Sequence, residues 1–365
     1  MNIVFRTDAS HHIGSGHVYR CLTLALALKK NGHQVLFVCR QHQGHLIELI
    51  KDCYKITVRV LQIDTDWIPK KLIPKHIKWL GADQCKDAQE TINAIKDVGV
   101  VDILVVDHYA IDQDWEAELK KHIRFLVVID ELADRKHCCD VLIDQTVWGH
   151  PHQVYKKLLP SHCLSLIGPK YAMLRSMFYE IRNNFVQSSV KNKKLKMLIF
   201  LGAADLSDVP LKLMTVCKIL ASEPIEIHFI LNEKSKHYEQ VKKLSQLQNN
   251  LIHYSYVDDM AKLMSQMDVY CGSGGTITWE RCCMGLSGVV FSIAENQYGF
   301  SKTMGDKGYH FFLGRESELE AQEIVDALKN YWTNLDIKLE METNSFGLVD
   351  GLGASRIQEH LERLL

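Results

Sequence analysis

Short apolar segments alternate with longer amphipathic segments along most of the chain. The apolar segments are rich in Ile, Val and Phe, which predicts buried strands, and the amphipathic segments between them predict helices. This alternation is typical of parallel sheets covered by helices on both faces, as in Rossmann-like domains. The predicted strands are 2–6, 34–39, 103–107, 125–129, 141–143, 197–201, 225–231, 251–254, 268–271 and 289–292.

The same pattern predicts two domains, because it is interrupted once and then starts again. A polar, basic stretch at 183–196 follows the first set of elements, and a new strand begins at Met197. We therefore expect an N-terminal domain over 1–182, a linker over 183–196 and a C-terminal domain over 197–365. Predicted helices include 17–30, which ends at Asn31-Gly32, 114–121, and an amphipathic last helix at 354–365 with Leu361, Leu364 and Leu365 free to pack.

Composition narrows the possible partners. The 365 residues include 43 Lys and Arg against 44 Asp and Glu, so no net positive charge exists to hold nucleic acid. The first residues enter a strand directly and form no apolar signal segment, and no run approaches the roughly 20 apolar residues of a membrane span. We expect a cytoplasmic protein without a membrane span, whose eleven Cys are reduced and mostly buried.

The loop between the first strand and the first helix holds the most informative chemistry. Gly14, Ser15 and Gly16 precede a helix start, where backbone N–H groups can approach an anionic ligand. The loop is not the dinucleotide fingerprint, because Tyr19 stands where that motif has its third glycine. The plain alternative for Gly-x-Gly is a tight turn. We predict that this loop contacts substrate.

His17 follows directly, in the first turn of the predicted helix. The positive end of the helix dipole disfavours an imidazolium there and so favours a neutral ring. A neutral imidazole can accept a proton from water, which makes His17 the candidate general base. Without its context, a capping or packing histidine would be the better interpretation.

A second strand–glycine–helix unit follows the strand at 268–271. Gly274, Gly275 and Thr276 offer backbone and hydroxyl donors suited to a diphosphate. Glu280 lies about one helical turn further on, where a carboxylate can accept hydrogen bonds from two ribose hydroxyls. The alternative is a surface or capping carboxylate. Residues 202–205, Gly-Ala-Ala-Asp, form a third candidate loop whose plain interpretation is a turn.

Two Asp-x-Asp triplets are present, at 64–66 and 112–114. In other nucleotide-sugar enzymes this pattern binds a divalent cation, but a triplet of two common residues arises easily by chance. We predict no metal site and no cofactor.

Taken together, these segments resemble the UDP-sugar hydrolases of pseudaminic acid synthesis, which remove UDP from 2,4-diacetamido-2,4,6-trideoxy-beta-L-altropyranose. The order and spacing of the matching segments carry the resemblance, whereas no single segment would. The chain departs from the family in one loop, where the family commonly has a double glycine and this chain has Ala203 and Ala204. The matching segments are 6–10, 13–25, 79–81, 107–109, 129–131, 168–175, 272–276, 279–280 and 295–297.

The resemblance implies a glycosyltransferase-B-like architecture, similar to that of the enzyme that adds N-acetylglucosamine to lipid I. It implies that the C-terminal domain holds UDP and that the N-terminal domain faces the sugar. It makes His17 the catalytic base and Glu280 a nucleotide ligand, with no obligate protein partner inferred. Further predicted substrate contacts are Asp8, Tyr109, Arg175 and Asn296.

The implied reaction is attack by water on the anomeric carbon with departure of UDP, a good leaving group whose charge backbone N–H groups can stabilise. Three alternatives remain open at this stage. A glycosyltransferase would replace water with an acceptor hydroxyl, and a hydrolysing UDP-sugar 2-epimerase would begin by eliminating UDP. An inert UDP-sugar binding protein could keep the second glycine loop, but the presence of His17 in its motif argues against it.

Overall fold

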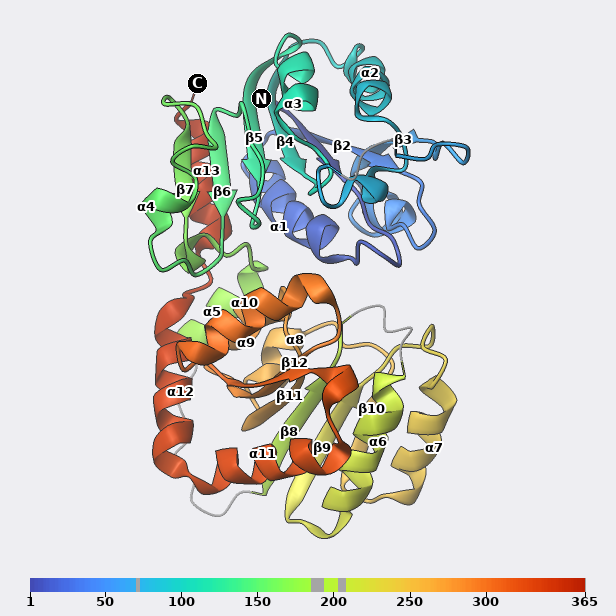
Figure 1. Cartoon of the computed structure of the whole chain (residues 1–365), viewed down its shortest axis with the longest axis vertical. Helices are drawn as coiled ribbons and strands as arrows, with labels where there is room; N and C mark the ends of the chain where they lie inside the picture. Colours follow the sequence, from blue (N-terminus) through green and yellow to red (C-terminus); the bar gives the residue numbers. More distant parts are fainter. Residues whose placement is uncertain (70–72, 185–193, 203–207, 365) are drawn as a thin grey trace. The chain divides into compact units, whose positions relative to one another are not determined.

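The computed structural model describes residues 1–69, 73–184, 194–202 and 208–364, which form two compact units. Unit 1 comprises Met1–Met173 and Leu352–Leu365, and unit 2 comprises Leu174–Gly351. Each unit is an α/β domain built on one sheet whose described strand pairs are all parallel (Figure 1). The predicted fold class of two Rossmann-like domains is confirmed.

The sheet of unit 1 has seven strands in the order β3-β2-β1-β4-β5-β6-β7. Its strands are β1 (Asn2–Thr7), β2 (Gln34–Arg40), β3 (Thr57–Leu61), β4 (Val101–Asp107), β5 (Ile123–Ile129), β6 (Val141–Asp144) and β7 (Leu164–Ile167). Its helices are α1 (Gly16–Lys30), α2 (Gln84–Ile95), α3 (Gln113–Leu119), α4 (Pro151–Val154) and α13 (Gly353–Glu362), with a π-helical turn at Leu49–Cys53 and 3-10 turns at Ile77–Leu80 and Pro169–Tyr171.

Successive strand residues point to opposite faces of this sheet, and both faces are buried. Ile3 and Phe5 of β1 join one apolar cluster with residues of α1 and α13. Val4, between them, joins the other cluster, which includes Trp115 of α3. A parallel sheet covered on both faces needs apolar residues at every position, which explains the near-continuous apolar segments in the sequence.

The sheet of unit 2 has six strands in the order β10-β9-β8-β11-β12-β13. Its strands are β8 (Leu195–Phe200), β9 (Ile225–Ile230), β10 (Leu251–Tyr254), β11 (Val269–Ser273), β12 (Gly288–Ser292) and β13 (Phe311–Arg315). Its helices are α5 (Ser176–Asn183), α6 (Val209–Ile219), α7 (Tyr238–Leu247), α8 (Met260–Met264), α9 (Ile277–Cys283), α10 (Glu295–Asp306), α11 (Ala321–Thr333) and α12 (Leu335–Leu348), with 3-10 turns at Leu220–Ser222 and Glu316–Glu318.

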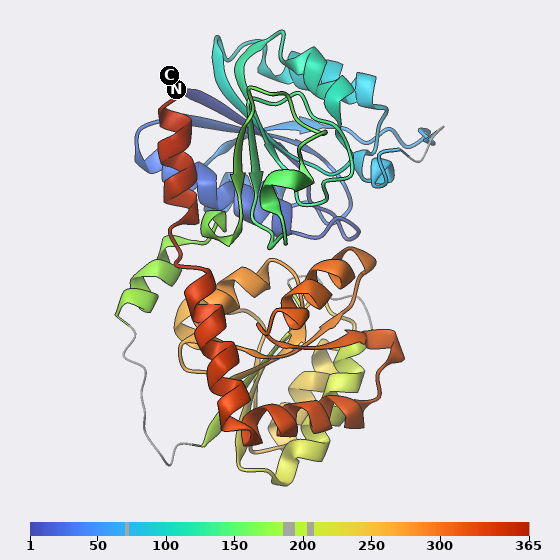
Figure 2. The ribbon, with the colours of Figure 1, turned by 60° about the vertical axis from the view of Figure 1, so that its left-hand side comes forward.

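The division into units differs from the predicted domains at both ends of unit 2. The boundary falls after Met173 rather than within 183–196, part of which lies outside the described residues, and α13 belongs to unit 1. Figure 2 shows α13, in dark red, beside the blue helix α1. Ile357 and Leu361 of α13 are fully buried in the core of unit 1, and such burial contributes roughly 1.5 to 3 kcal/mol per side chain.

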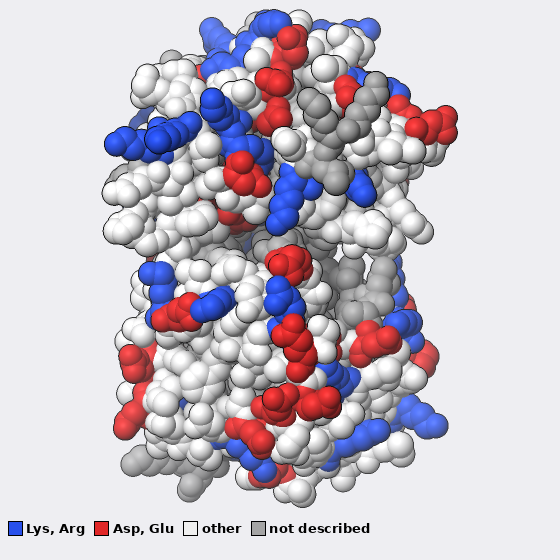
Figure 3. Space-filling view, viewed as in Figure 1, with Lys and Arg blue, Asp and Glu red and all other residues white. Residues whose placement is uncertain are grey.

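Lys and Arg are interspersed with Asp and Glu on the face drawn in Figure 3, as the balanced composition predicts. Among the described residues, no helix is long and apolar enough to cross a membrane.

Candidate active site

The carboxyl ends of three neighbouring strands of unit 1 bring ionisable side chains together. Strand β1 leads into the glycine loop, β4 ends at Asp107, and Glu131 follows the end of β5. Thr7 at the end of β1 pairs in register with Asp107, so the loop after β1 starts beside this carboxylate. Ligands of open parallel sheets bind at this edge.

His17 is the second residue of α1, and its ring is held by Asp107. The His17 Nδ1 atom lies 2.6 Å from Asp107 Oδ1. Within the described part of the chain, no hydrogen bond reaches Nε2, and 8% of the residue's surface stays exposed. A carboxylate on Nδ1 fixes the tautomer in which Nδ1 carries the hydrogen and Nε2 its lone pair, and it stabilises the imidazolium that forms when Nε2 takes a proton.

Arg20, one helical turn further along α1, fixes the carboxylate in turn. Its Nε and Nη2 atoms donate to the two oxygens of Asp107 at 2.6 and 2.7 Å, and its Nη1 lies 2.6 Å from Glu131 Oε2. Burial acts to raise the pKa of Asp107, but the charge of Arg20 and the hydrogen bonds from Arg20 and His17 outweigh it and hold that pKa below its usual range. Asp107 is therefore ionised beside His17.

Three aromatic rings pack together beside His17, and we call His76, Trp79 and Tyr109 the aromatic cap. The Tyr109 ring meets His17 edge-on with centroids 4.6 Å apart, and Trp79 meets it at 6.3 Å. His76 packs on Trp79 at 4.3 Å, and burial lowers the pKa of His76, which favours its neutral form. The Tyr109 hydroxyl donates to Glu131 at 2.5 Å, so the predicted substrate contact Tyr109 lies beside the candidate base.

The glycine loop is closed by its own hydrogen bonds. Gly14 has a φ of +81°, where a side chain would be strained, and its N–H donates to the Ser10 carbonyl at 2.9 Å. Ser15 precedes α1 without capping it through its side chain, and Gly16 is the first helical residue. Gly14, Ser15 and Gly16 are all partly exposed, so a ligand can reach this loop beside His17.

Asp8 follows β1 and lies in the interior of unit 1. Its side chain is completely buried, with Oδ1 2.7 Å from Arg6 Nη1 and 2.6 Å from the Arg40 backbone nitrogen. Its other oxygen faces His108 Nε2 at 3.2 Å. Contact of Asp8 with sugar or water stays a prediction; the contacts that the structure shows tie the ends of β1, β2 and β4 together.

The second glycine loop lies between β11 and α9 in unit 2, and packing against other elements accounts for part of its glycine content. A Cβ atom at Gly274 would overlap the Ser301 hydroxyl and lie 3.1 Å from the Ser301 Cβ, so α10 packs closely against this glycine. A Cβ at Gly275 would meet only the end of the Gln297 side chain, at 3.5 Å. Gly275 and Thr276, which precedes α9, are therefore the positions where the loop's composition is not explained by packing.

Glu280 of α9 is a half-buried carboxylate to which no side-chain hydrogen bond is made within the described residues. Burial raises its pKa to about 7, and the charge of Arg175 opposes that rise. Arg175 itself donates to the Asp258 carbonyl at 3.2 Å. The structure thus relates two predicted substrate contacts, Glu280 and Arg175, within unit 2. Asn296 lies in α10, but its side chain is outside the described part of the structure. Residues 203–205 of the third predicted loop are outside the described part as well.

The two Asp-x-Asp triplets have ordinary structural roles. Asp64 forms an ion pair with Lys86 at 2.7 Å, and Asp112 caps α3 by accepting from the Asp114 backbone nitrogen. Over the described ranges, no three His, Cys, Asp or Glu side chains are placed to hold a metal ion.

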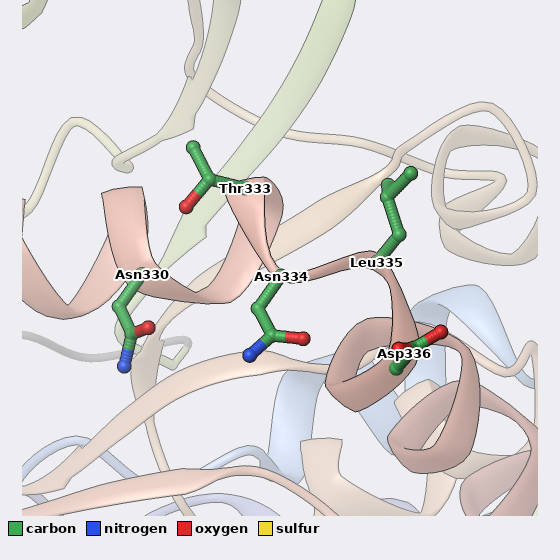
Figure 4. A pocket seen from close by; sticks show the side chains of 5 residues that line it. All are labelled: Asn330, Thr333, Asn334, Leu335 and Asp336. Atoms are coloured by element: carbon green, nitrogen blue, oxygen red, sulfur yellow. The ribbon is translucent and has the colours of Figure 1, made fainter.

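A hollow in unit 2 lies apart from these groups. It is an open depression of about 590 Å³ at the turn between α11 and α12, and none of the predicted site residues lines it (Figure 4). Its lining residues are Asn330, Thr333, Asn334, Leu335 and Asp336. We assign it no role in the candidate site.

The sequence interpretation missed the side chains that organise His17. Asp107, Arg20 and Glu131 lie within matching segments but had no assigned role. Asp107 is 90 residues from His17, so no local spacing relates them. One signal was present: an acidic residue at the carboxyl end of a buried strand lies at the same sheet edge as the glycine loop.

No known protein-family profile matches the chain. It is 25% identical over 312 residues to UDP-2,4-diacetamido-2,4,6-trideoxy-beta-L-altropyranose hydrolase of Campylobacter jejuni, covering 85% of this chain and 98% of that protein. The chain is similar to a UDP-sugar hydrolase. It is also 24% identical to the spore coat polysaccharide biosynthesis protein SpsG of Bacillus subtilis, over 100% of this chain and 98% of SpsG. The resemblance drawn from the sequence motifs is confirmed.

Solved structures place the fold. MurG of Acinetobacter baumannii superposes with a TM-score of 0.67 at 16% identity, covering 99% of each chain. CalG4, the calicheamicin glycosyltransferase, gives a TM-score of 0.65 at 14% identity, covering 100% of this chain and 98% of CalG4. At such identities the likeness concerns the fold, which is glycosyltransferase-B-like as predicted.

Proposed function

We propose that this protein hydrolyses UDP-2,4-diacetamido-2,4,6-trideoxy-beta-L-altropyranose to the free sugar and UDP. The observation that carries the proposal is the Asp107–His17 pair, in which a buried carboxylate holds Nδ1 at 2.6 Å and leaves Nε2 free to act. The similarity to the Campylobacter jejuni hydrolase supports the substrate.

In the proposed reaction, the oxygen of a water molecule forms a bond to the anomeric carbon of the sugar. His17 Nε2 takes a proton from that water, and Asp107 stabilises the resulting imidazolium. The bond between the anomeric carbon and the diphosphate oxygen breaks, and its electron pair leaves with UDP. Arg20 is a positioning residue, since it touches Asp107 and Glu131 rather than the ring's free nitrogen.

Unit 2 is proposed to bind the nucleotide. Gly274, Gly275 and Thr276 would face the diphosphate, and Glu280 would accept hydrogen bonds from the ribose, as the family resemblance implies. The raised pKa of Glu280 supports this role, because a half-buried carboxylate without a hydrogen-bond donor is stabilised by a ligand that supplies two hydroxyl donors. Gly14, Ser15 and Gly16 would contact the sugar beside His17.

Incubation with this UDP-sugar and no acceptor, followed by chromatographic detection of UDP and free sugar, tests the proposal. A hydrolase forms both products in equal amounts. UDP release that requires an added sugar or lipid acceptor would identify a glycosyltransferase instead, and release of a 2-epimerised sugar from UDP-N-acetylglucosamine would identify a hydrolysing epimerase. No UDP from any UDP-sugar would contradict the proposal.

A further inference from the structure

The aromatic cap narrows the approach to His17. Asp107 and Arg20 occupy the Nδ1 side of the ring, at 2.6 and 3.3 Å from that atom. The rings of Tyr109 and Trp79 meet the imidazole at interplanar angles of 80° and 78°. Only 8% of the His17 surface is exposed, and Trp79 and Tyr109 are two of the rings that pack beside it, so little space is left for a nucleophile next to the imidazole.

The cap is also firmly held. Trp79 lies in the 3-10 turn Ile77–Leu80, which is anchored by the buried side chains of Ile77 and Leu80. The Trp79 backbone nitrogen donates to the His76 carbonyl at 2.8 Å, and the His76 ring packs on the indole. On the other side, the hydroxyl of Tyr109 is fixed by Glu131. Moving the indole aside would therefore disturb several contacts.

We propose that Trp79 is a specificity-determining residue that excludes alcohols from His17 and so restricts the nucleophile to water. This inference rests on the proposed hydrolase function. An alcohol would react as water does: its oxygen bonds to the anomeric carbon, its proton passes to His17 Nε2, and UDP leaves with the electron pair of the broken bond. The base and the leaving group are the same for water and for an alcohol. Only the space beside His17 therefore distinguishes the two nucleophiles.

Methanol is the most sensitive probe, because it is larger than water by only one carbon. One methylene in a closed pocket changes selectivity by about 10-fold to 200-fold. The wild-type protein and the variant Trp79→Ala are incubated with the UDP-sugar in the same water–methanol mixture, and mass spectrometry gives the ratio of methyl glycoside to free sugar. We expect this ratio to rise at least about tenfold in Trp79→Ala.

Trp67→Ala is the matched control. Trp67 is a second partly exposed tryptophan of unit 1, and within the described residues its ring has no contact with His17. Its substitution should leave the product ratio at the wild-type value. Trp79→Phe keeps an aromatic ring and should also stay near that value. If Trp79→Ala fails to fold by circular dichroism, Trp79→Leu carries the same test.

The outcomes separate the two proposals. A wild-type protein that releases no UDP contradicts the hydrolase function itself. If the wild-type protein hydrolyses the substrate and Trp79→Ala forms free sugar with an unchanged product ratio, Trp79 is not the barrier. Methyl glycoside formed readily by the wild-type protein overturns the inference as well. Folded Trp79→Ala and Trp79→Leu proteins without turnover would overturn it too, since Trp79 would then be needed to bind substrate.

Discussion

His17 and Asp107 form a hydrogen-bonded pair, with 2.6 Å between Nδ1 and Oδ1, although 90 residues separate them in the sequence. One comes from the start of α1 and the other from the end of β4. The pair gives the candidate base a defined tautomer, and the first two predictions test its two members separately.

Replacing His17 with Asn should abolish turnover, because the amide has no basic nitrogen to accept a proton from water. The affinity for UDP and the melting temperature should stay near the parent values, since position 17 lies in a helix's first turn and tolerates a small polar side chain. Kinetics, calorimetry with UDP and thermal unfolding measure the three quantities. His33→Asn, just beyond the other end of α1, is the control and should retain turnover. Substantial turnover by His17→Asn would place the base elsewhere.

Asp107→Asn should lower kcat by roughly 10²-fold to 10⁴-fold, because the amide can donate to Nδ1 and so favour the tautomer with hydrogen on Nε2. The variant should also be less stable, by about 3 to 5 kcal/mol, since Arg20 loses its bidentate partner in a buried site. Turnover is therefore measured well below the melting temperature of the variant. Asp102→Asn, at the opposite end of β4, should keep normal kcat. An unchanged kcat in Asp107→Asn would show that the pair has no chemical role.

Glu280→Ala should weaken UDP binding by roughly 1 to 3 kcal/mol, the usual cost of losing hydrogen bonds to a charged group. The change should appear mainly in KM, because the ribose contact would be the same in the ground state and the transition state. Isothermal titration calorimetry with UDP measures it directly. Glu239→Ala, on an exposed part of α7, should bind UDP normally. Equal affinities of the Glu280 variant and the parent would remove Glu280 from the nucleotide site.

Glu280 also predicts a pH dependence of stability. Burial raises its pKa from 4.5 to about 7, so the folded protein retains a proton that the unfolded chain loses between these pH values. The contribution of Glu280 to the free energy of unfolding is therefore fully present below about pH 4.5, and it is lost as the pH rises to about 7. Glu280→Gln cannot ionise and should exceed the parent's free energy of unfolding by up to about 3 kcal/mol above pH 7. Denaturant titrations across this pH range measure the difference in the free energy of unfolding between Glu280→Gln and the parent. A difference that does not change with pH would contradict the prediction.

The bond that breaks can be identified with water enriched in oxygen-18. Since His17 is proposed to activate water against the sugar, the label should enter the anomeric hydroxyl, with none in UDP. Direct displacement should also invert the anomeric configuration. Rapid NMR of the first product is needed, because mutarotation erases the configuration and, more slowly, exchange removes the label. Label in UDP, or UMP and sugar 1-phosphate as products, would mean attack at phosphorus.

Most strands could be predicted from the sequence, and the three that could not all lie at sheet edges. All ten predicted strands are present, with ends shifted by a few residues. The missed strands are β3, β7 and β13, which lie at the edges. Edge strands are solvated on one side, and the exposed Thr57 of β3 and Ser165 of β7 break the continuous apolar pattern. The interior strands and the edge strand β10 could therefore be recognised from their apolar residues, whereas β3, β7 and β13 could not.

Part of the candidate site could be predicted from neighbouring residues in the sequence, and part depends on residues far apart in the sequence. The glycine loop and His17 are contiguous, and so their motif is visible without a structure. The order of strands brings Asp107 and Glu131 close to His17, and the connection between β3 and β4 brings Trp79 there. No local spacing in the sequence predicts these contacts. The packing partner of α13 is likewise non-local, because amphipathicity predicts that this helix packs but not which unit it packs against.

The return of α13 to unit 1 has a consequence for how the chain folds during synthesis. Domains generally fold as units as they emerge from the ribosome, the earlier one first. Here unit 2 is one continuous stretch, Leu174–Gly351, and all of it is translated before α13. Until residues 353–362 emerge, the side of α1 that α13 covers stays exposed, so the half of the protein made first is the half completed last. A nascent chain halted before α13 would present this apolar surface to chaperones.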